Sequence, residues 1–211
     1  MEMLHALLNL LLHLDTHLNS LVSTYGSWAY AILFLILFCE TGLVITPFLP
    51  GDSLLFASGT LAANLEQSMN IHLLFAILVL ASILGNTLNY FIGRFLSQRA
   101  FDPAHSRFLK PAYLHSTQQF YERHGGKTIM IARFMPIIRT FAPFVAGMGA
   151  MNFHRFFFYN VLGALLWVGS LLYVSYAFGN LSFVKDHFSA VIFSLIFLSL
   201  LPALIGYFRQ R

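Results

Sequence analysis

Three long apolar stretches dominate the chain, at residues 70–93, 153–179 and 188–208. A helix needs about 20 mostly apolar residues to cross the hydrocarbon of a bilayer, and each stretch supplies that length. The hydropathy pattern therefore predicts an all-α polytopic membrane protein with three full transmembrane helices. The length of 211 residues suits a single membrane domain, 1–211.

Two further apolar stretches, 27–66 and 128–152, contain helix-breaking residues. Proline removes a backbone donor and interrupts a helix, so the chain should turn at these positions. We expect each stretch to form a re-entrant hairpin of two half-helices, with breaks at Pro47, Pro50, Gly51, Pro136 and Pro143. An alternative for the first stretch is a full crossing by 27–47, which would place the N-terminus inside.

The basic residues predict the topology. All twelve Lys and Arg follow residue 93, and basic residues concentrate in cytoplasmic segments. The segment 94–127, the region near Arg155 and the C-terminus are therefore expected inside, and the link 180–187 outside. The hairpin 128–152 must then enter and leave through the cytoplasmic face. The hairpin 27–66 would enter from the opposite face.

A weak internal repetition agrees with two opposed hairpins. The pattern Tyr-x-x-Gly ends both 70–93 and 153–179, and Pro50 and Pro136 occupy corresponding positions. Since the hairpins would open to opposite faces, the repeat would be inverted. Broken helices in an inverted repeat are typical of transporters whose binding site lies near the bilayer midplane.

Two segments outside these stretches have amphipathic patterns. In 1–23, leucines recur at helical spacing, with histidines and other polar residues on the opposite side. Within 94–127, a second pattern begins at Pro111 and ends before Gly125. Both patterns predict interfacial helices that lie on the membrane or pack against the bundle.

The composition narrows the function classes. Apolar residues make up 58% of the chain and charged residues 9%, whereas a soluble domain carries about 25% charged residues. The basic residues have a topological explanation, so no nucleic-acid partner is expected. The chain has no Walker or Gly-x-Ser-x-Gly motif, and its histidines show no metal-ligand spacing. We therefore expect no enzyme, no cofactor and no metal.

Charged residues inside the two broken stretches are the candidates for function. An ionised group at bilayer depth costs about 2.5 kcal/mol or more, so it tends to face a protein interior or an aqueous pathway. Glu40 and Asp52 lie in the first stretch and Arg133 and Arg139 in the second, which suggests one site assembled from both. Arginine favours bidentate contact with phosphate, and the acids are candidate proton carriers.

Structural roles compete with these assignments. Glu40 has the alternative role of a hydrated carboxyl at a helix end, and Asp52 that of the N-cap of the half-helix that follows it. Arg133 and Arg139 have the alternative of reaching out to the cytoplasmic interface.

Five short motifs, in this order, resemble the DedA family, also called the SNARE-associated or VTT-domain family. They are Phe38-Cys-Glu40-Thr-Gly42, Pro47-Phe-Leu-Pro50-Gly51-Asp52, Gly85-x4-Tyr90-x2-Gly93-Arg94, Arg133-Phe-x-Pro136-x2-Arg139-x3-Pro143-x3-Gly147 and Asn160-x2-Gly163-Ala-x2-Trp167. The resemblance covers roughly residues 20–210. It implies a bacterial inner-membrane protein with two opposed re-entrant hairpins. The family often has Gly-Asp before the tyrosine of the third motif, whereas this chain has Gly85-Asn86. Asn86 cannot carry a proton, although it can hydrogen-bond a headgroup.

The resemblance also implies transport of lipid carriers, linked to the proton-motive force. The expected substrate is an anionic membrane lipid, undecaprenyl phosphate or a phospholipid. Arg133 and Arg139 would bind the phosphate together with Ser53 and Asn86, while Glu40 and Asp52 would load and release protons. Three alternatives stay open: a proton-coupled exporter of small cations or drugs, a non-transporting scaffold for envelope lipid homeostasis, and an intramembrane phosphatase. Each of these four functions is compatible with a homo-oligomer.

Overall fold

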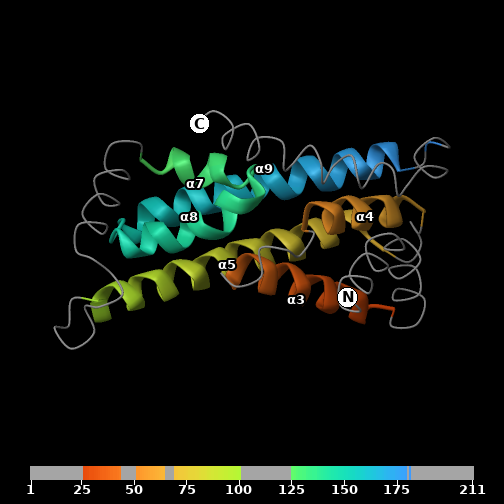
Figure 1. Cartoon of the computed structure of the whole chain (residues 1–211). Coiled ribbons are helices and arrows are strands. Elements are labelled where there is room, and N and C mark those ends of the chain that lie inside the picture. The colour runs from red at the N-terminus through yellow and green to blue at the C-terminus, as the bar shows by residue number, and fades with distance from the viewer. Residues whose placement is uncertain (1–25, 44–50, 65–68, 101–124, 180, 182–211) are drawn as a thin grey trace, which may run out of the picture. The chain divides into compact units, whose positions relative to one another are not determined.

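The computed structural model describes residues 26–43, 51–64, 69–100, 125–179 and 181, and every regular element in these ranges is an α-helix (Figure 1). The helices are α3 (Trp28–Gly42), α4 (Gly51–Asn64), α5 (Ile71–Ala100), α7 (Lys127–Ala132), α8 (Pro136–Met148) and α9 (Phe153–Phe178). The all-α prediction is confirmed for this part of the chain. The predicted helix 1–23, the amphipathic helix after Pro111, the span 188–208 and the breaks at Pro47 and Pro50 lie outside the described residues.

Two of the predicted spans are confirmed as long apolar helices. Ile71–Ser97 within α5 and Phe153–Phe178 of α9 are each long and apolar enough to cross a membrane. The first helix extends further than predicted, because α5 continues past Gly93 to Ala100. No proline or glycine interrupts residues 94–100, so the polar residues there prolong the helix instead of ending it.

Both long helices begin with the same local structure, an asparagine N-cap. The Oδ1 atom of Asn70 accepts hydrogen bonds from the backbone N–H of His72 (2.9 Å) and Leu73 (3.2 Å). The Oδ1 atom of Asn152 accepts from the backbone N–H of His154 (3.0 Å) and Arg155 (3.3 Å). Each cap satisfies N–H groups that the first turn of a helix leaves without partners.

The stretch 128–152 is divided into two helices at Arg133–Met135. Met135 is extended, with φ −117° and ψ 106°, as expected for a residue that precedes proline. Pro136 then occupies the first turn of α8, where its missing N–H costs nothing. Pro143 differs from the sequence expectation, because it lies inside α8 and does not end the helix. Its effect is local, since it supplies no N–H to the carbonyl four residues earlier.

The end of α8 is a Schellman turn. The N–H of Met151 donates to the Ala146 carbonyl and that of Ala150 donates to the Gly147 carbonyl, both at 3.1 Å. Ala150 has φ +51°, the left-handed conformation that this turn requires and that glycine usually provides. The Tyr90 hydroxyl donates to the Met151 carbonyl, so α5 secures the turn.

The described helices divide into two compact units. The first unit contains Trp28–Ile36 of α3, all of α4, Ile71–Leu78 of α5 and Val168–Phe178 of α9. The second unit contains Leu37–Gly42 of α3, Val79–Ala100 of α5, α7, α8 and Phe153–Trp167 of α9.

In the first unit, α4 and α9 pack closely because glycines lie at the contacts. A Cβ atom on Gly59 would clash with the Ser175 side chain and would lie 2.5 Å from the Leu172 carbonyl oxygen. A Cβ atom on Gly179 would lie 2.8 Å from the Cα of Thr60. Small residues allow such close helix contacts in membranes, where dispersion forces drive the packing.

In the second unit, glycines bring α5 against two partners. A Cβ atom on Gly85 would clash with the Thr41 hydroxyl of α3, and one on Gly93 would clash with the Phe144 carbonyl of α8. Gly85 and Gly93 therefore allow close packing of α5 against α3 and α8. The aromatic core lies nearby, where Tyr90 stacks on Phe156 with ring centroids 4.4 Å apart.

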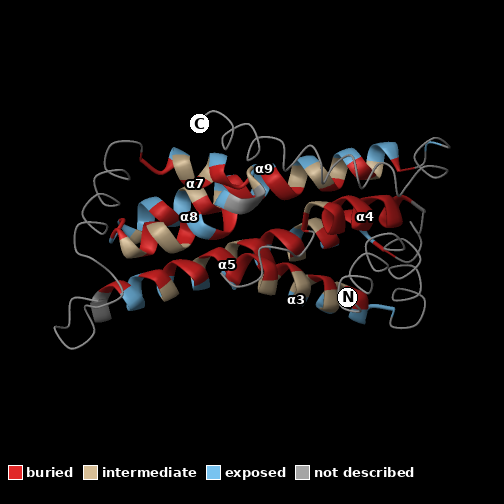
Figure 2. Ribbon diagram, viewed as in Figure 1, coloured by how far each residue is buried: buried red, intermediate tan, exposed pale blue. Residues whose placement is uncertain are grey.

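Exposed and buried positions alternate along α5 (Figure 2), and large apolar side chains are among the exposed ones while polar side chains are among the buried ones. Its exposed residues include a helical stripe of large apolar side chains, which are Leu73, Leu80, Leu84, Leu88, Phe91 and Phe95. Its buried residues include a polar stripe, which is Ser82, Asn86, Asn89 and Ser97. An apolar outer face with a hydrogen-bonded polar interior suits a helix whose solvent is lipid.

Candidate functional site

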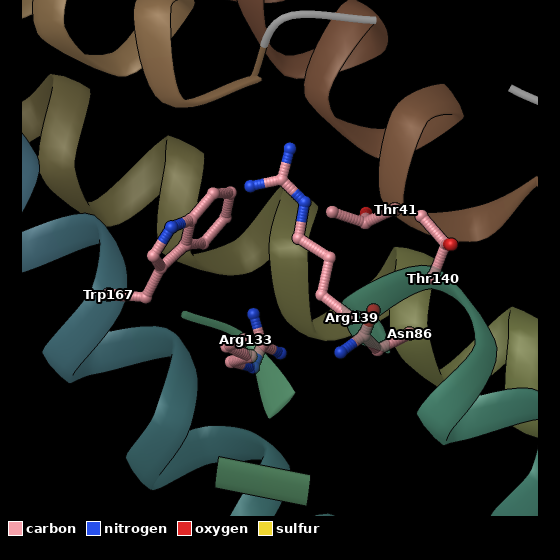
Figure 3. Close-up of a pocket in the computed structure, with 6 residues that line it drawn as sticks. All are labelled: Thr41, Asn86, Arg133, Arg139, Thr140 and Trp167. Carbon is pink, nitrogen blue, oxygen red and sulfur yellow. The ribbon is translucent and has the colours of Figure 1, made fainter. Parts of the chain in front are cut away.

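A small cavity lies inside the second unit, lined by both candidate arginines (Figure 3). Its lining comes from α3, α5, the break before α8, α8 itself and α9, and consists of Thr41, Asn86, Arg133, Arg139, Thr140 and Trp167. The cavity volume is about 10 Å³, close to what one water molecule needs. The space therefore fits a single oxygen-sized group.

Arg139 forms a buried ion pair with Glu40. Its Nη2 atom lies 2.5 Å from Oε1 of Glu40, and the exposed fractions of the two side chains are 8% and 2%. The guanidinium also lies over the Trp167 ring, with its central carbon 5.1 Å from the ring centroid. Such a cation–π contact is stronger when it is shielded from water. Arg139 is thus held between a carboxylate and an aromatic face.

Arg133 is also buried, with 3% exposure, but its described partners are all neutral. Its Nη1 atom donates to the Ser82 hydroxyl. Its Nη2 atom donates to Oδ1 (2.5 Å) and to the backbone carbonyl (3.3 Å) of Asn160. The Nε–H has no hydrogen-bond partner, and no described carboxylate forms an ion pair with this guanidinium. A buried charge compensated only by dipoles is costly and favours an anionic partner.

Gly163 makes the position of Arg133 attainable. A Cβ atom at residue 163 would lie 2.8 Å from Cδ and 3.0 Å from Nε of Arg133. The glycine on α9 therefore leaves the space through which the arginine side chain runs.

A network of amides links Arg133 to α5. The Asn160 side chain donates through Nδ2 to the Ile83 carbonyl (3.1 Å) and the Thr87 hydroxyl (3.3 Å). Its Oδ1 accepts from Arg133 and from Nδ2 of Asn86 (3.2 Å). This network fixes the orientation of Asn160 and thereby the direction of the arginine.

Asn89 ties the ion-paired segments together. Its Nδ2 atom donates to the backbone carbonyl of Thr140 (2.7 Å) on α8 and to that of Thr41 (3.3 Å) on α3. These threonines directly follow Arg139 and Glu40 in the sequence. One buried amide of α5 therefore fixes both backbones that carry the ion pair.

Four of the sequence-predicted residues, Glu40, Asn86, Arg133 and Arg139, lie in the second unit around this cavity. Asp52 and Ser53 belong to the first unit, where they occupy the first turn of α4. Because α4 begins at Gly51, Asp52 lies within the helix and is not its N-cap. A carboxylate in the first turn is still favoured by the helix dipole.

Sequence reasoning missed the neutral members of the site as contributors to it: Thr41, Ser82, Asn89, Thr140, Asn160 and Trp167. One signal was available, because Ser82, Asn86 and Asn89 recur at helical spacing within a predicted span. In the described part of the chain, no group of three or more His, Cys, Asp or Glu residues could hold a metal ion.

Comparisons with known proteins agree with the motifs. The family model of the VTT domain matches residues 49–177. Protein DedA of Escherichia coli K12 is 50% identical over 211 residues, which is all of this chain and 96% of the relative. An uncharacterized membrane protein of Mycobacterium leprae is 38% identical over 184 residues, covering 86% of this chain and 82% of the relative.

A third relative, the inner membrane protein YghB of Escherichia coli K12, is 35% identical over 188 residues, covering 89% of this chain and 80% of the relative. No solved structure matches the chain significantly. The family model and the full-length identity together show that the chain belongs to the DedA family of VTT-domain membrane proteins.

Proposed function

We propose that the protein moves an anionic lipid headgroup across the bacterial inner membrane. The observation that carries this proposal is the environment of Arg133, a buried guanidinium beside a cavity with only neutral described partners. An anionic oxygen that entered the cavity would meet this uncompensated charge in a medium of low dielectric, where the attraction is strong. A phosphate group fits that requirement.

The outer surfaces of the helices support a lipid as the source of the anion. Large apolar side chains are exposed along α5 and α9, and the cavity residues are buried behind them. An acyl tail could stay in hydrocarbon while only the headgroup contacts the polar residues. We propose undecaprenyl phosphate as the carrier lipid, with a phospholipid as the second anionic candidate.

The Glu40–Arg139 pair supports a link to protons. The carboxylate of Glu40 forms an ion pair with the Arg139 guanidinium and so competes with a phosphate for it. Protonation of Glu40 would weaken the pair and free the guanidinium for a phosphate, and loss of the proton would restore the pair. Asp52, in the first unit, is proposed as the second carboxyl of this cycle.

The proposed mechanism uses the opposed hairpins as its moving parts. The break before α8 and the predicted break at Pro47 and Pro50 would allow 128–152 and 27–66 to open toward opposite faces of the membrane. Opening is necessary, because a cavity of about 10 Å³ holds one oxygen and not an entire headgroup.

Lipid flux in reconstituted liposomes tests the charge requirement. Arg133→Gln should lower the flux of a labelled anionic lipid at least about tenfold, because a charged hydrogen bond is lost. Arg155→Gln is the matched control, since Arg155 is exposed in the first turn of α9 and should leave flux near the wild-type level. Wild-type flux from Arg133→Gln would count against a phosphate site.

The proton link has its own test in the same liposomes. Glu40→Gln combined with Asp52→Asn keeps the size of both side chains but removes their titration. Flux should lose its response to an imposed proton gradient, or stop, while binding of the headgroup persists. A scaffold predicts no change, and a small-cation exporter predicts a proton-linked cation flux in place of lipid flux.

A further inference from the structure

The hydrogen bonds around Arg133 determine which way each amide faces. The Ile83 carbonyl can only accept, so the atom of Asn160 that lies 3.1 Å from it must be the donating nitrogen. The carbonyl oxygen of Asn160 consequently points the other way. This oxygen meets Nη2 of Arg133 at 2.5 Å, which can only donate. Both ends of the Asn160 amide thus agree on one orientation.

The same logic fixes Asn86. The Oδ1 atom of Asn160 lies 3.2 Å from the Asn86 amide. Two carbonyl oxygens at that distance would repel each other, so the nitrogen of Asn86 must face Asn160. Figure 3 shows this nitrogen on the side of Arg133.

The remaining atom of the Asn86 amide is its carbonyl oxygen. Asn86 lines the cavity together with Arg133 and Arg139, and among the described residues its only hydrogen bond is the donation from Nδ2 to Asn160. The Asn86 Oδ1 accepts no hydrogen bond from a described residue. The cavity lining therefore combines positive charge with the Asn86 amide, whose orientation follows from these hydrogen bonds.

We infer that Asn86 is a specificity-determining residue whose Oδ1 accepts a hydrogen bond from an O–H group of the bound oxyanion. This inference rests on the proposed function of the same cavity. The ligand that it selects, bound once the cavity has opened as proposed above, carries a charged oxygen for Arg133 and a protonated oxygen for Asn86. A phosphate monoester in its singly protonated form has both, whereas a phosphate diester has only acceptor oxygens.

The penalty for a diester is a contact between two acceptors. An ester or anionic oxygen of the diester would face the Asn86 carbonyl oxygen without a hydrogen bond between them, and the loss of one hydrogen bond lowers affinity. Sites that hydrogen-bond a ligand hydroxyl reject analogues without it more strongly than apolar pockets reject a change in size. A single neutral hydrogen bond corresponds to a preference of about tenfold.

Two soluble headgroup analogues separate charge from hydrogen bonding. At about pH 5, below the second phosphate pKa of about 6, methyl phosphate is mainly a monoanion with one O–H. Dimethyl phosphate is a monoanion without an O–H. Calorimetric titration of the purified full-length protein in lipid nanodiscs should show about tenfold tighter binding of methyl phosphate.

Variants test whether Asn86 causes the preference for methyl phosphate over dimethyl phosphate. Asn86→Leu keeps the approximate volume without the acceptor, so the affinity ratio of the two analogues should fall to about one while dimethyl phosphate still binds. Leu84→Ala is the control, because Leu84 is exposed on the outer face of the same helix, outside the network, and should retain the ratio. A tenfold ratio that survives in Asn86→Leu would overturn the assignment.

A wild-type comparison makes the test independent of folding of the variant. Methylphosphonate at the same pH should bind about tenfold more tightly than its monomethyl ester, which has the same charge and no O–H. Equal binding within both analogue pairs would overturn the role of Asn86 and leave the anion site standing. Binding of none of the four would overturn the anion site, and with it the proposed function.

Discussion

The two buried arginines of the cavity have different chemical environments. Arg139 contacts the carboxylate of Glu40 and the face of Trp167, whereas Arg133 is held by a hydroxyl, a carbonyl and an amide. The sequence predicted that both arginines bind the same phosphate. Under the proposed function, Arg133 would attract the anion in the resting state, and Arg139 would become available once protonation of Glu40 weakens their ion pair.

Substitution of Arg139 by lysine tests whether lipid flux requires the planar guanidinium or only its positive charge. Arg139→Lys keeps the charge but removes the planar group that lies over Trp167 and donates to Glu40, so we expect lipid flux to fall about tenfold or more. The matched control is Arg94→Lys, because Arg94 is exposed and donates one hydrogen bond to Tyr90 (3.3 Å), which an ammonium can also make. Complementation of a transport-deficient strain at the wild-type level by Arg139→Lys would contradict the role proposed here.

Gly163 gives a second prediction, which concerns the position of Arg133. Gly163→Ala places a methyl group 2.8 Å from Cδ of Arg133, so the side chain must shift and lose its alignment with Asn160 and Ser82. We expect methyl phosphate affinity to fall about tenfold, since misplacement of a binding group by about 1 Å is costly.

Gly169→Ala, also on α9, is the control for Gly163→Ala. Its added Cβ would meet the Phe75 ring at 3.4 Å, an ordinary contact, so affinity should stay at the wild-type level. Equal affinities for the two alanine variants would show that Arg133 tolerates displacement.

The charged half of the site could be predicted from sequence, and the neutral half could not. Glu40, Arg133 and Arg139 are conspicuous because charge is expensive within apolar stretches. Asn89 and Asn160 are not, since a single amide is tolerated in many spans and its partners depend on which helices meet. The direction in which Asn86 presents its oxygen is a property of a network that joins α5 and α9, and no local pattern encodes it.

At the scale of elements, the long spans followed from hydropathy because length and apolarity are additive along the chain. The end of α5 could not be predicted from hydropathy. Gly93 resembles a helix stop signal, but it lies within the helix at a close contact with the Phe144 backbone. Pro143 was also expected to break its helix. It instead lies inside α8, since packing against neighbouring helices can retain a helix that lacks one backbone hydrogen bond.

The turn after α8 gives a prediction about stability. Ala150 adopts φ +51° in a Schellman turn, a conformation that costs a residue with a Cβ about 1–2 kcal/mol. Ala150→Gly should therefore stabilise the protein by up to about 1 kcal/mol, after the extra chain entropy of glycine is subtracted. A rise in the thermal unfolding midpoint of the purified protein measures this effect.

Ala150→Val is the opposing variant for that turn. A β-branched residue is less tolerant of positive φ, so its midpoint should fall below that of the wild type. Identical midpoints for the glycine, alanine and valine forms would mean that the left-handed turn carries no strain.

At the scale of the whole molecule, both long helices expose large apolar side chains and bury polar ones. Leu80, Leu84 and Leu88 are exposed on α5, while Ser82, Asn86 and Asn89 are buried. In water this arrangement would be unstable, and in lipid it leaves polar groups to pair with one another. The inner-membrane relatives and the apolar helices therefore agree on the setting of the protein.

The orientation in that membrane gives the last prediction. Because all Lys and Arg follow residue 93, the positive-inside rule places 94–127 and the C-terminus in the cytoplasm and 180–187 outside. In a Cys39→Ser background, Ser182→Cys should react with a membrane-impermeant thiol reagent in intact cells. Ala104→Cys and Arg211→Cys should react only after the membrane is opened, which also serves as the control that each thiol is reactive.

Labelling of Ala104→Cys from outside would reverse the assignment. The segment 128–152 would then have to cross the membrane fully to bring Arg155 inside, so the re-entrant hairpin, and the opening motion proposed for it, would have to be abandoned.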